Sequence, residues 1–257
     1  MKAVDPILPI EDEGPEALSI LGVKVHNVTI EHALALATRY MDEPGVHQIA
    51  TVNPEFIMTA QNDPAFYRVL NAADLCLPDG IGLLLAGRWL GQPLSERVAG
   101  SDFVYRLAAE AANHGWRLFL LGAAPGVADL AAEMLEEKYP GLRIAGTYPG
   151  SPEMDENAAL VDRINESGAD ILYVAYGAPA QDIWIARNVD AFDNLHIAIG
   201  VGGSLDFVTG RAIRAPRWTQ RIGLEWLYRL VREPWRWKRM LALPRFTVLV
   251  LMSRSRR

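Results

Sequence analysis

Two short stretches of the sequence are the most informative about its fold: Thr51-Val52-Asn53-Pro54-Glu55 and Leu77-Pro78-Asp79-Gly80-Ile81-Gly82. Each follows a short apolar run and places a polar side chain where a strand should end and a helix should begin. In an α/β domain ligands bind at that edge, because helix N-termini there present free N–H groups and a positive dipole end. The two stretches therefore predict one edge of a sheet and a candidate site on it.

The residue types within these stretches favour specific roles. Asn53 followed by Pro54 is typical of a helix start, with the asparagine as N-cap and the proline at the first helical position. Glycines after Asp79 allow a tight turn and close approach of a ligand. We predict that Asp79 is a general base with Thr51 and Asn53 beside it. The alternative is that both stretches are only well-capped turns, and residue types alone do not separate the two.

Composition bounds the class of protein. The chain has 257 residues, half of them hydrophobic, which is enough for one large α/β domain with or without an appendage. The single cysteine, Cys76, excludes an intramolecular disulfide, fits a reducing compartment, and lies in an apolar run where burial is expected. Residues 1–16 are acidic and aperiodic, which predicts a flexible arm and no signal peptide. No apolar run is long enough to predict a transmembrane helix.

Charge is distributed unevenly along the chain. Residues 211–257 contain 13 Lys or Arg and 2 Asp or Glu, whereas the preceding 210 residues contain 12 and 29. Four of the seven tryptophans also lie in this C-terminal segment. An acidic body joined to a basic, Trp-rich segment predicts an anionic partner such as a membrane surface, a diphosphate or nucleic acid.

Apolar runs alternate with amphipathic segments over residues 17–210, which predicts one body with a buried, mostly parallel sheet flanked by helices. The expected strands are residues 23–28, 46–52, 73–77, 116–121, 142–146, 171–176 and 196–201. Gly122 and Gly126 form a partial phosphate-binding turn rather than the full dinucleotide fingerprint. A nicotinamide dehydrogenase is therefore a poor interpretation, although a nucleotide at this edge remains plausible.

Residues 211–257 are expected to be a helical appendage. Arg232, Arg236 and Arg239 recur at helical spacing, and arginine with tryptophan on short amphipathic helices is typical of binding in the plane of a membrane interface. An ordinary capping helix with a solvated basic face is the alternative. Nucleic acid is disfavoured because the acidic body would repel a duplex.

Ten segments of the chain, in consistent order, resemble the WecG/TagA/CpsF family of glycosyltransferases (glycosyltransferase family 26). They are residues 51–55, 73–75, 77–82, 96–102, 120–122, 139–141, 177–182, 200–207, 214–216 and 225–230. The resemblance implies a Rossmann-like, inverting, metal-independent enzyme without a cofactor. It implies transfer of N-acetylmannosamine, its uronic acid or a hexose from a UDP-sugar to an undecaprenyl-diphosphate-linked sugar, for teichoic acid or another cell-surface polysaccharide. A cytoplasmic location on the inner face of the bacterial membrane follows, and a homo-oligomer is possible.

Residue roles follow from the resemblance as well. Asp79 matches the family's proposed base, Thr51 and Asn53 match polar donor-site positions, and Arg97 matches a pocket arginine. The predicted substrate-binding set is Arg97, Gln181, Gly122, Gly203, Arg229, Arg236 and Arg239. The family's Pro-Lys-Gln-Glu segment reads Pro179-Ala180-Gln181-Asp182 here.

An inverting transfer needs one carboxylate to accept the acceptor's proton and positive charge on the departing UDP. The sequence shows no DxD-like acidic pair near the pocket, so arginines are expected to supply that charge instead of a metal. A non-catalytic nucleotide-sugar-binding protein on the membrane is the alternative function.

Overall fold

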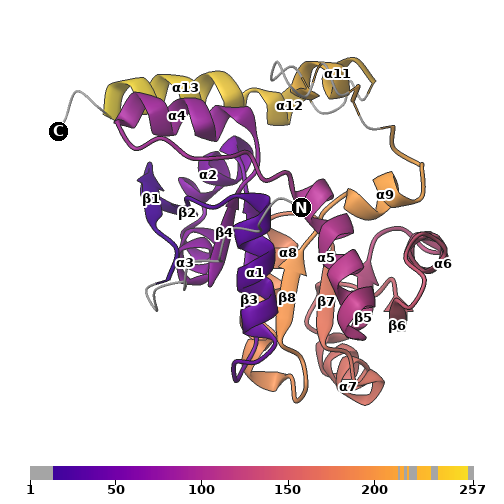
Figure 1. Cartoon of the computed structure of the whole chain (residues 1–257). Helices are drawn as coiled ribbons and strands as arrows, with labels where there is room; N and C mark the ends of the chain where they lie inside the picture. Colours follow the sequence, from indigo (N-terminus) through magenta and orange to yellow (C-terminus); the bar gives the residue numbers. More distant parts are fainter. Residues whose placement is uncertain (1–13, 214, 217–218, 220–224, 233–236, 254–257) are drawn as a thin grey trace, which may run out of the picture.

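The computed structural model describes residues 14–213, 215–216, 219, 225–232 and 237–253. Its centre is a six-stranded parallel sheet with the strand order β4-β3-β8-β7-β5-β6 (Figure 1). These strands are β3 (His47–Val52), β4 (Leu75–Pro78), β5 (Arg117–Gly122), β6 (Arg143–Tyr148), β7 (Ile171–Ala175) and β8 (Ile197–Gly200). The predicted fold class, α/β with a Rossmann-like parallel sheet flanked by helices, is confirmed.

Helices cover both faces of the sheet. They are α1 (Ile30–Tyr40), α2 (Pro54–Ala60), α3 (Pro64–Ala72), α4 (Ile81–Leu90), α5 (Gly100–His114), α6 (Val127–Lys138), α7 (Asn157–Ser167), α8 (Ala180–Asn188) and α9 (Ser204–Val208), with the 3-10 helix η1 (Val189–Ala191) after α8. Alternate side chains of each strand enter different clusters: Ile49 packs with α1 and α5, whereas Ala50 packs with α2 and α3. Burial on both faces explains why the strands are continuously apolar in sequence.

A two-stranded antiparallel hairpin, which the sequence analysis did not predict in full, protects the edge of the sheet. It consists of β1 (Ala17–Ile20) and β2 (Val23–His26). Burial lowers the pKa of His26 to about 4, so its neutral Nδ1 accepts a hydrogen bond of 2.8 Å from the Cys76 N–H on edge strand β4. The hairpin thereby occupies an edge donor that would otherwise be open to another strand.

Among the described residues, the body is followed by the helices α11 (Glu225–Arg232), α12 (Trp237–Met240) and α13 (Ala242–Ser253). In Figure 1, α13 lies alongside α4, and it also contacts α2. Phe246 and Val250 of α13 are buried in the cluster that contains Ile57 and Leu83. Part of the segment 211–257 is therefore packed into the core of the body. The division at residue 210 and the arm over residues 1–16 stay predictions, and residues 1–13 lie outside the described part.

Replacing Phe246 by Ala should destabilise the whole protein. Truncation of a buried Phe typically costs about 3–5 kcal/mol, because apolar contacts are lost and a cavity remains. The matched control is Leu249→Ala on the same helix, whose side chain is 39% exposed and should cost less than about 1 kcal/mol. Urea denaturation of the full chain measures both values. Equal, small losses would show that α13 does not contribute to the core.

Candidate active site at the ends of β3 and β4

The first candidate residues lie at the ends of two neighbouring parallel strands. The register pairs Val52 of β3 with Pro78 of β4, so Asn53 and Asp79 follow at the same level. The Asp79 N–H also donates a hydrogen bond of 2.8 Å to the Val52 carbonyl oxygen. This bond extends the ladder by one residue and fixes the backbone from which the Asp79 side chain emerges.

Two helix N-termini meet at the same place. The Asn53 Oδ1 accepts a hydrogen bond of 3.0 Å from the Phe56 N–H, which confirms Asn53 as the cap of α2. Gly80, with a φ of 114°, turns the chain into α4. A Cβ on Gly82 would lie 2.8 Å from the Pro54 ring, so this glycine is required for the close approach of α4 to α2. The positive ends of both helices therefore face one region.

A cavity of about 1080 Å³ opens beside these helix ends. Asn53, Glu55, Asp79 and Arg97 form its polar part, and a large apolar wall forms the rest. That wall includes Ile81, Leu85, Trp89, Trp226, Leu230, Trp237, Met240, Leu241, Phe246, Val250 and Leu251. The structure thus brings together three predicted residues, Asn53, Asp79 and Arg97. It adds Glu55, to which the sequence analysis assigned no role.

Thr51, Gly122 and Gly203 are not among the residues that line this cavity. Thr51 is buried against the start of α5, where a Cβ on Gly100 would lie 2.8 Å from its Cγ2. Gly122 ends β5 with a φ of 98°, and a Cβ there would lie 2.8 Å from the Ala175 backbone. Gly203 precedes the short helix α9. All three lie at or next to the carboxyl ends of their strands, which is the edge of a parallel sheet where ligands bind.

Gln181 connects two strand ends instead of projecting into the cavity. Its Oε1 accepts hydrogen bonds from the N–H groups of Gly177, at 3.0 Å, and Gly202, at 2.9 Å. Those residues follow β7 and β8. A Cβ on Gly200 would lie 2.4 Å from the Gln181 Nε2, so the glycine makes room for this side chain. Gln181 therefore shapes the turns after both strands.

Asp182, next to Gln181, is a fully buried acid. Burial raises the pKa of its carboxyl to about 7, although the nearby Gln181 amide and its own backbone N–H partly oppose this. Neither carboxyl oxygen has a well-aligned hydrogen-bond partner among the described residues. The neutral form of Asp182 is consequently favoured in the folded protein to an unusual degree.

The predicted arginines of the C-terminal segment are only partly described. Arg229 lies on α11 and Arg239 on α12, but their side chains, like the whole of Arg236, lie outside the described residues. Their predicted contact with a diphosphate stays a prediction. Among the described helices, none is long and apolar enough to cross a lipid bilayer. The described part also holds no group of three or more His, Cys, Asp or Glu residues arranged to bind a metal ion.

A parallel α/β sheet with polar side chains and a large cavity at its carboxyl edge is typical of α/β proteins that bind a ligand there. Within that class, residues 18–257 match the model of the glycosyl transferase WecG/TagA/CpsF family. The chain belongs to this family and is a glycosyltransferase.

Two relatives from bacilli carry the same full name. The chain is 37% identical over 216 residues to an N-acetylglucosaminyldiphosphoundecaprenol N-acetyl-beta-D-mannosaminyltransferase of Bacillus spizizenii strain W23. It is 36% identical over 216 residues to the protein of that name in Bacillus subtilis strain 168. Each comparison covers 84% of this chain and 83% of the relative.

Asp182→Asn should change how stability depends on pH. The raised pKa means that the folded state binds more protons than the unfolded state between about pH 4 and pH 7. The contribution of Asp182 is therefore most favourable below about pH 4 and is lost as pH rises through about 7. The full pKa shift corresponds to a decrease in the free energy of unfolding on the order of 4 kcal/mol as pH rises through this range.

Asparagine cannot ionise, so the stability of Asp182→Asn relative to wild type should increase from pH 4 to pH 8. Urea denaturation at several pH values measures this difference. A difference that stays constant across that range would contradict a buried, titrating Asp182.

Proposed function

We propose that this glycosyltransferase moves an N-acetylmannosamine-type sugar from a UDP-sugar to a sugar linked to undecaprenyl diphosphate, for cell-surface polysaccharide synthesis. The observation that carries the proposal is the cavity that Asp79, Asn53 and Arg97 line together with a large apolar wall. A polyprenyl-diphosphate sugar has the same division into a polar head and an apolar chain. The names of both bacillar relatives support this acceptor class.

The proposed reaction is a single, inverting displacement with Asp79 as base. The acceptor hydroxyl gives its proton to the Asp79 carboxylate while its oxygen attacks the anomeric carbon of the donor sugar. The bond between that carbon and the UDP oxygen breaks, and UDP leaves with the electron pair. The Asn53 Oδ1 is occupied by the Phe56 N–H, so its Nδ2 is the group suited to donate to a substrate hydroxyl.

Charge on the departing diphosphate is met by fixed donors in this proposal. Arg97 lines the cavity, and the N-termini of α2 and α4 add positive potential beside it. In this proposal, backbone N–H groups of the turns at Gly122 and Gly203 bind the donor along the same sheet edge, at which Thr51 also lies. Gln181 holds the second of these turns through the Gly202 N–H. Arg229, Arg236 and Arg239 are proposed to supply the remaining positive charge for the departing diphosphate. The transfer needs no metal ion in this scheme.

The outer apolar surface supports attachment to a membrane. Exposed large apolar side chains gather on α4 and the C-terminal helices. They are Leu85, Trp89, Trp226, Leu227, Val231, Trp237, Leu241, Val248, Leu249, Leu251 and Met252. Together with the basic charge of residues 211–257, such a surface favours peripheral binding to anionic lipid at the inner face of the membrane, where the acceptor is held.

Asp79→Asn should remove activity with little effect on donor binding. Asparagine keeps the shape of the side chain but does not accept the proton, so turnover should fall on the order of 10²–10⁴-fold. The measurement is UDP release from UDP-N-acetylmannosamine with a short-chain diphosphate-linked N-acetylglucosamine acceptor. Glu55→Gln is the matched control, because Glu55 is a second carboxylate among the described residues that line the cavity, and its loss should lower turnover by less than about tenfold.

The opposite order of effects would assign the base to Glu55. No release from wild type with any UDP-sugar would favour a non-catalytic nucleotide-sugar-binding protein. The same assay is run with and without EDTA. Activity that needs Mg²⁺ or Mn²⁺ would contradict charge stabilisation by arginines.

Val248→Ser with Met252→Ser should weaken membrane binding. Both side chains are 54% exposed, they share one face of α13, and neither lines the cavity. Removing this apolar area should reduce association with anionic phosphatidylglycerol vesicles on the order of tenfold. The control pair is Leu130→Ser with Met134→Ser, at the same spacing on α6, with exposures of 41% and 38%.

Vesicle sedimentation measures binding, and the soluble acceptor shows that both double variants keep their transfer activity. Equal binding by the two double variants would exclude α13 as the membrane-contacting face.

A further inference from the structure

The loop between α4 and α5 carries Arg97 and is attached to the body on both sides of that residue. On its N-terminal side, the Asn27 Oδ1 accepts hydrogen bonds from the Ser95 N–H, at 2.7 Å, and the Ser95 hydroxyl, at 2.8 Å. On its C-terminal side, the Val98 N–H donates 3.0 Å to the Pro78 carbonyl oxygen, directly before Asp79. The second attachment ties the loop to the strand that presents the proposed base.

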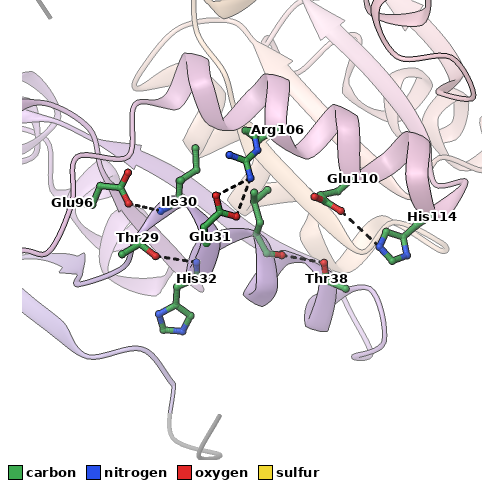
Figure 2. A network of polar contacts seen from close by, with 10 residues as sticks. Thr29, Ile30, Glu31, His32, Thr38, Glu96, Arg106, Glu110 and His114 are labelled. Carbon is green, nitrogen blue, oxygen red and sulfur yellow. Dashed lines mark hydrogen bonds and ion pairs between the residues drawn. The ribbon is translucent and has the colours of Figure 1, made fainter. Parts of the chain in front are cut away.

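A third attachment is made by Glu96, the residue next to Arg97. The Glu96 Oε2 accepts a hydrogen bond of 3.0 Å from the Ile30 N–H at the start of α1 (Figure 2). The Thr29 hydroxyl caps the same helix end through the His32 N–H at 3.1 Å. Thr29 and Glu96 therefore share the free N–H groups of α1, although Glu96 is 66 residues away in sequence.

Electrostatics strengthens this contact. The N-terminal end of α1 carries partial positive charge, and the Glu96 carboxylate lies against it. Glu96 is partly buried, so solvent screens the interaction less than it would at an exposed site. The Glu96 side chain contacts α1, whereas Arg97, the next residue, lines the cavity.

We propose that Glu96 is a positioning residue for Arg97: its contact with the N-terminus of α1 sets where the loop presents the guanidinium group to the substrate diphosphate. This inference rests on the proposed function, since it assigns Glu96 a role through Arg97 in that reaction. The Ser95 and Val98 hydrogen bonds hold the loop on either side of Glu96 and Arg97. The Glu96 hydrogen bond holds the residue that directly precedes Arg97 in the chain.

The test is a double-mutant cycle in UDP release. Glu96→Ala should lower kcat/KM on the order of tenfold, mainly by raising KM for the UDP-sugar donor, because Arg97 is less well placed against the donor diphosphate. Glu96→Gln should retain at least about half of the wild-type value, because its amide oxygen still accepts from the Ile30 N–H. In an Arg97→Ala background, Glu96→Ala should lower kcat/KM by less than about a further twofold, because the guanidinium group that Glu96 positions is absent.

Glu31→Ala is the matched control. Glu31 lies beside Ile30 and pairs with Arg106 of α5 at 2.9 Å, so its loss removes a different contact at the same end of α1 (Figure 2). We expect unchanged kcat/KM in both backgrounds for this variant. Thermal unfolding of every variant accompanies the kinetics. If Glu96→Ala does not fold, Glu96→Met replaces it, since methionine keeps the length of the side chain but has no carboxylate to accept from the Ile30 N–H.

Each outcome bears on a different statement. Equal fold-losses for Glu96→Ala with and without Arg97 would overturn the inference and leave the proposed function standing. So would a lowered melting temperature with unchanged kcat/KM. Full activity of Arg97→Ala would remove Arg97, and with it Glu96, from the reaction. No UDP release by wild type would refute the proposed function itself.

Discussion

The parallel register between β3 and β4 is the constraint on which the candidate site depends. It sets Asn53 and Asp79 at one level, and the bond from the Asp79 N–H to the Val52 carbonyl oxygen maintains that level one residue beyond the sheet. The contact of Gly82 with Pro54 then brings the starts of α4 and α2 together. A one-residue slip would reverse the side-chain directions of β4 and move Asp79 away from Asn53.

Features encoded by local sequence could be predicted. The Asn53-Pro54 helix start and the glycine turn after Asp79 are formed by neighbouring residues, and both are present in the structure. The alternating apolar and amphipathic segments likewise predict the parallel sheet, because strands that are buried on both faces are continuously apolar in sequence. The boundaries differ by one or two residues at most strands, since ends of elements depend on caps and neighbours.

Features that depend on distant contacts were missed for a physical reason. The packing of Phe246 against α2 and α4 joins the last helix of the chain to its first half, and no local pattern in residues 242–253 reveals a partner. Glu55 is a plausible first-turn acid by sequence, and only the position of the C-terminal helices places it in a cavity. The capping of α1 by Glu96 joins residues 66 apart. Such roles follow from tertiary structure, because residue type and spacing carry no signal for them.

Gln181 shows that a site residue can be found from sequence although its contacts cannot. The resemblance selected Gln181 as substrate-binding, yet its Oε1 is shared by the Gly177 and Gly202 N–H groups. An acceptor oxygen with two donors has little capacity for a third. Gln181 holds two turns in place, in the way that Glu96 is proposed to hold Arg97, and its predicted contact with substrate stays a prediction.

Both cases indicate how this site could stabilise a leaving diphosphate with protein groups alone. Arginines and backbone N–H groups stabilise developing charge efficiently only when they are already in position, because reorganisation during the reaction would cancel part of their effect. A flexible loop bearing Arg97 would lose that advantage. The attachments through Asn27, Glu96 and Val98 supply the required order from the body of the fold. In the proposed mechanism, the rigidity of this loop therefore has the same function as the fixed geometry of a bound cation.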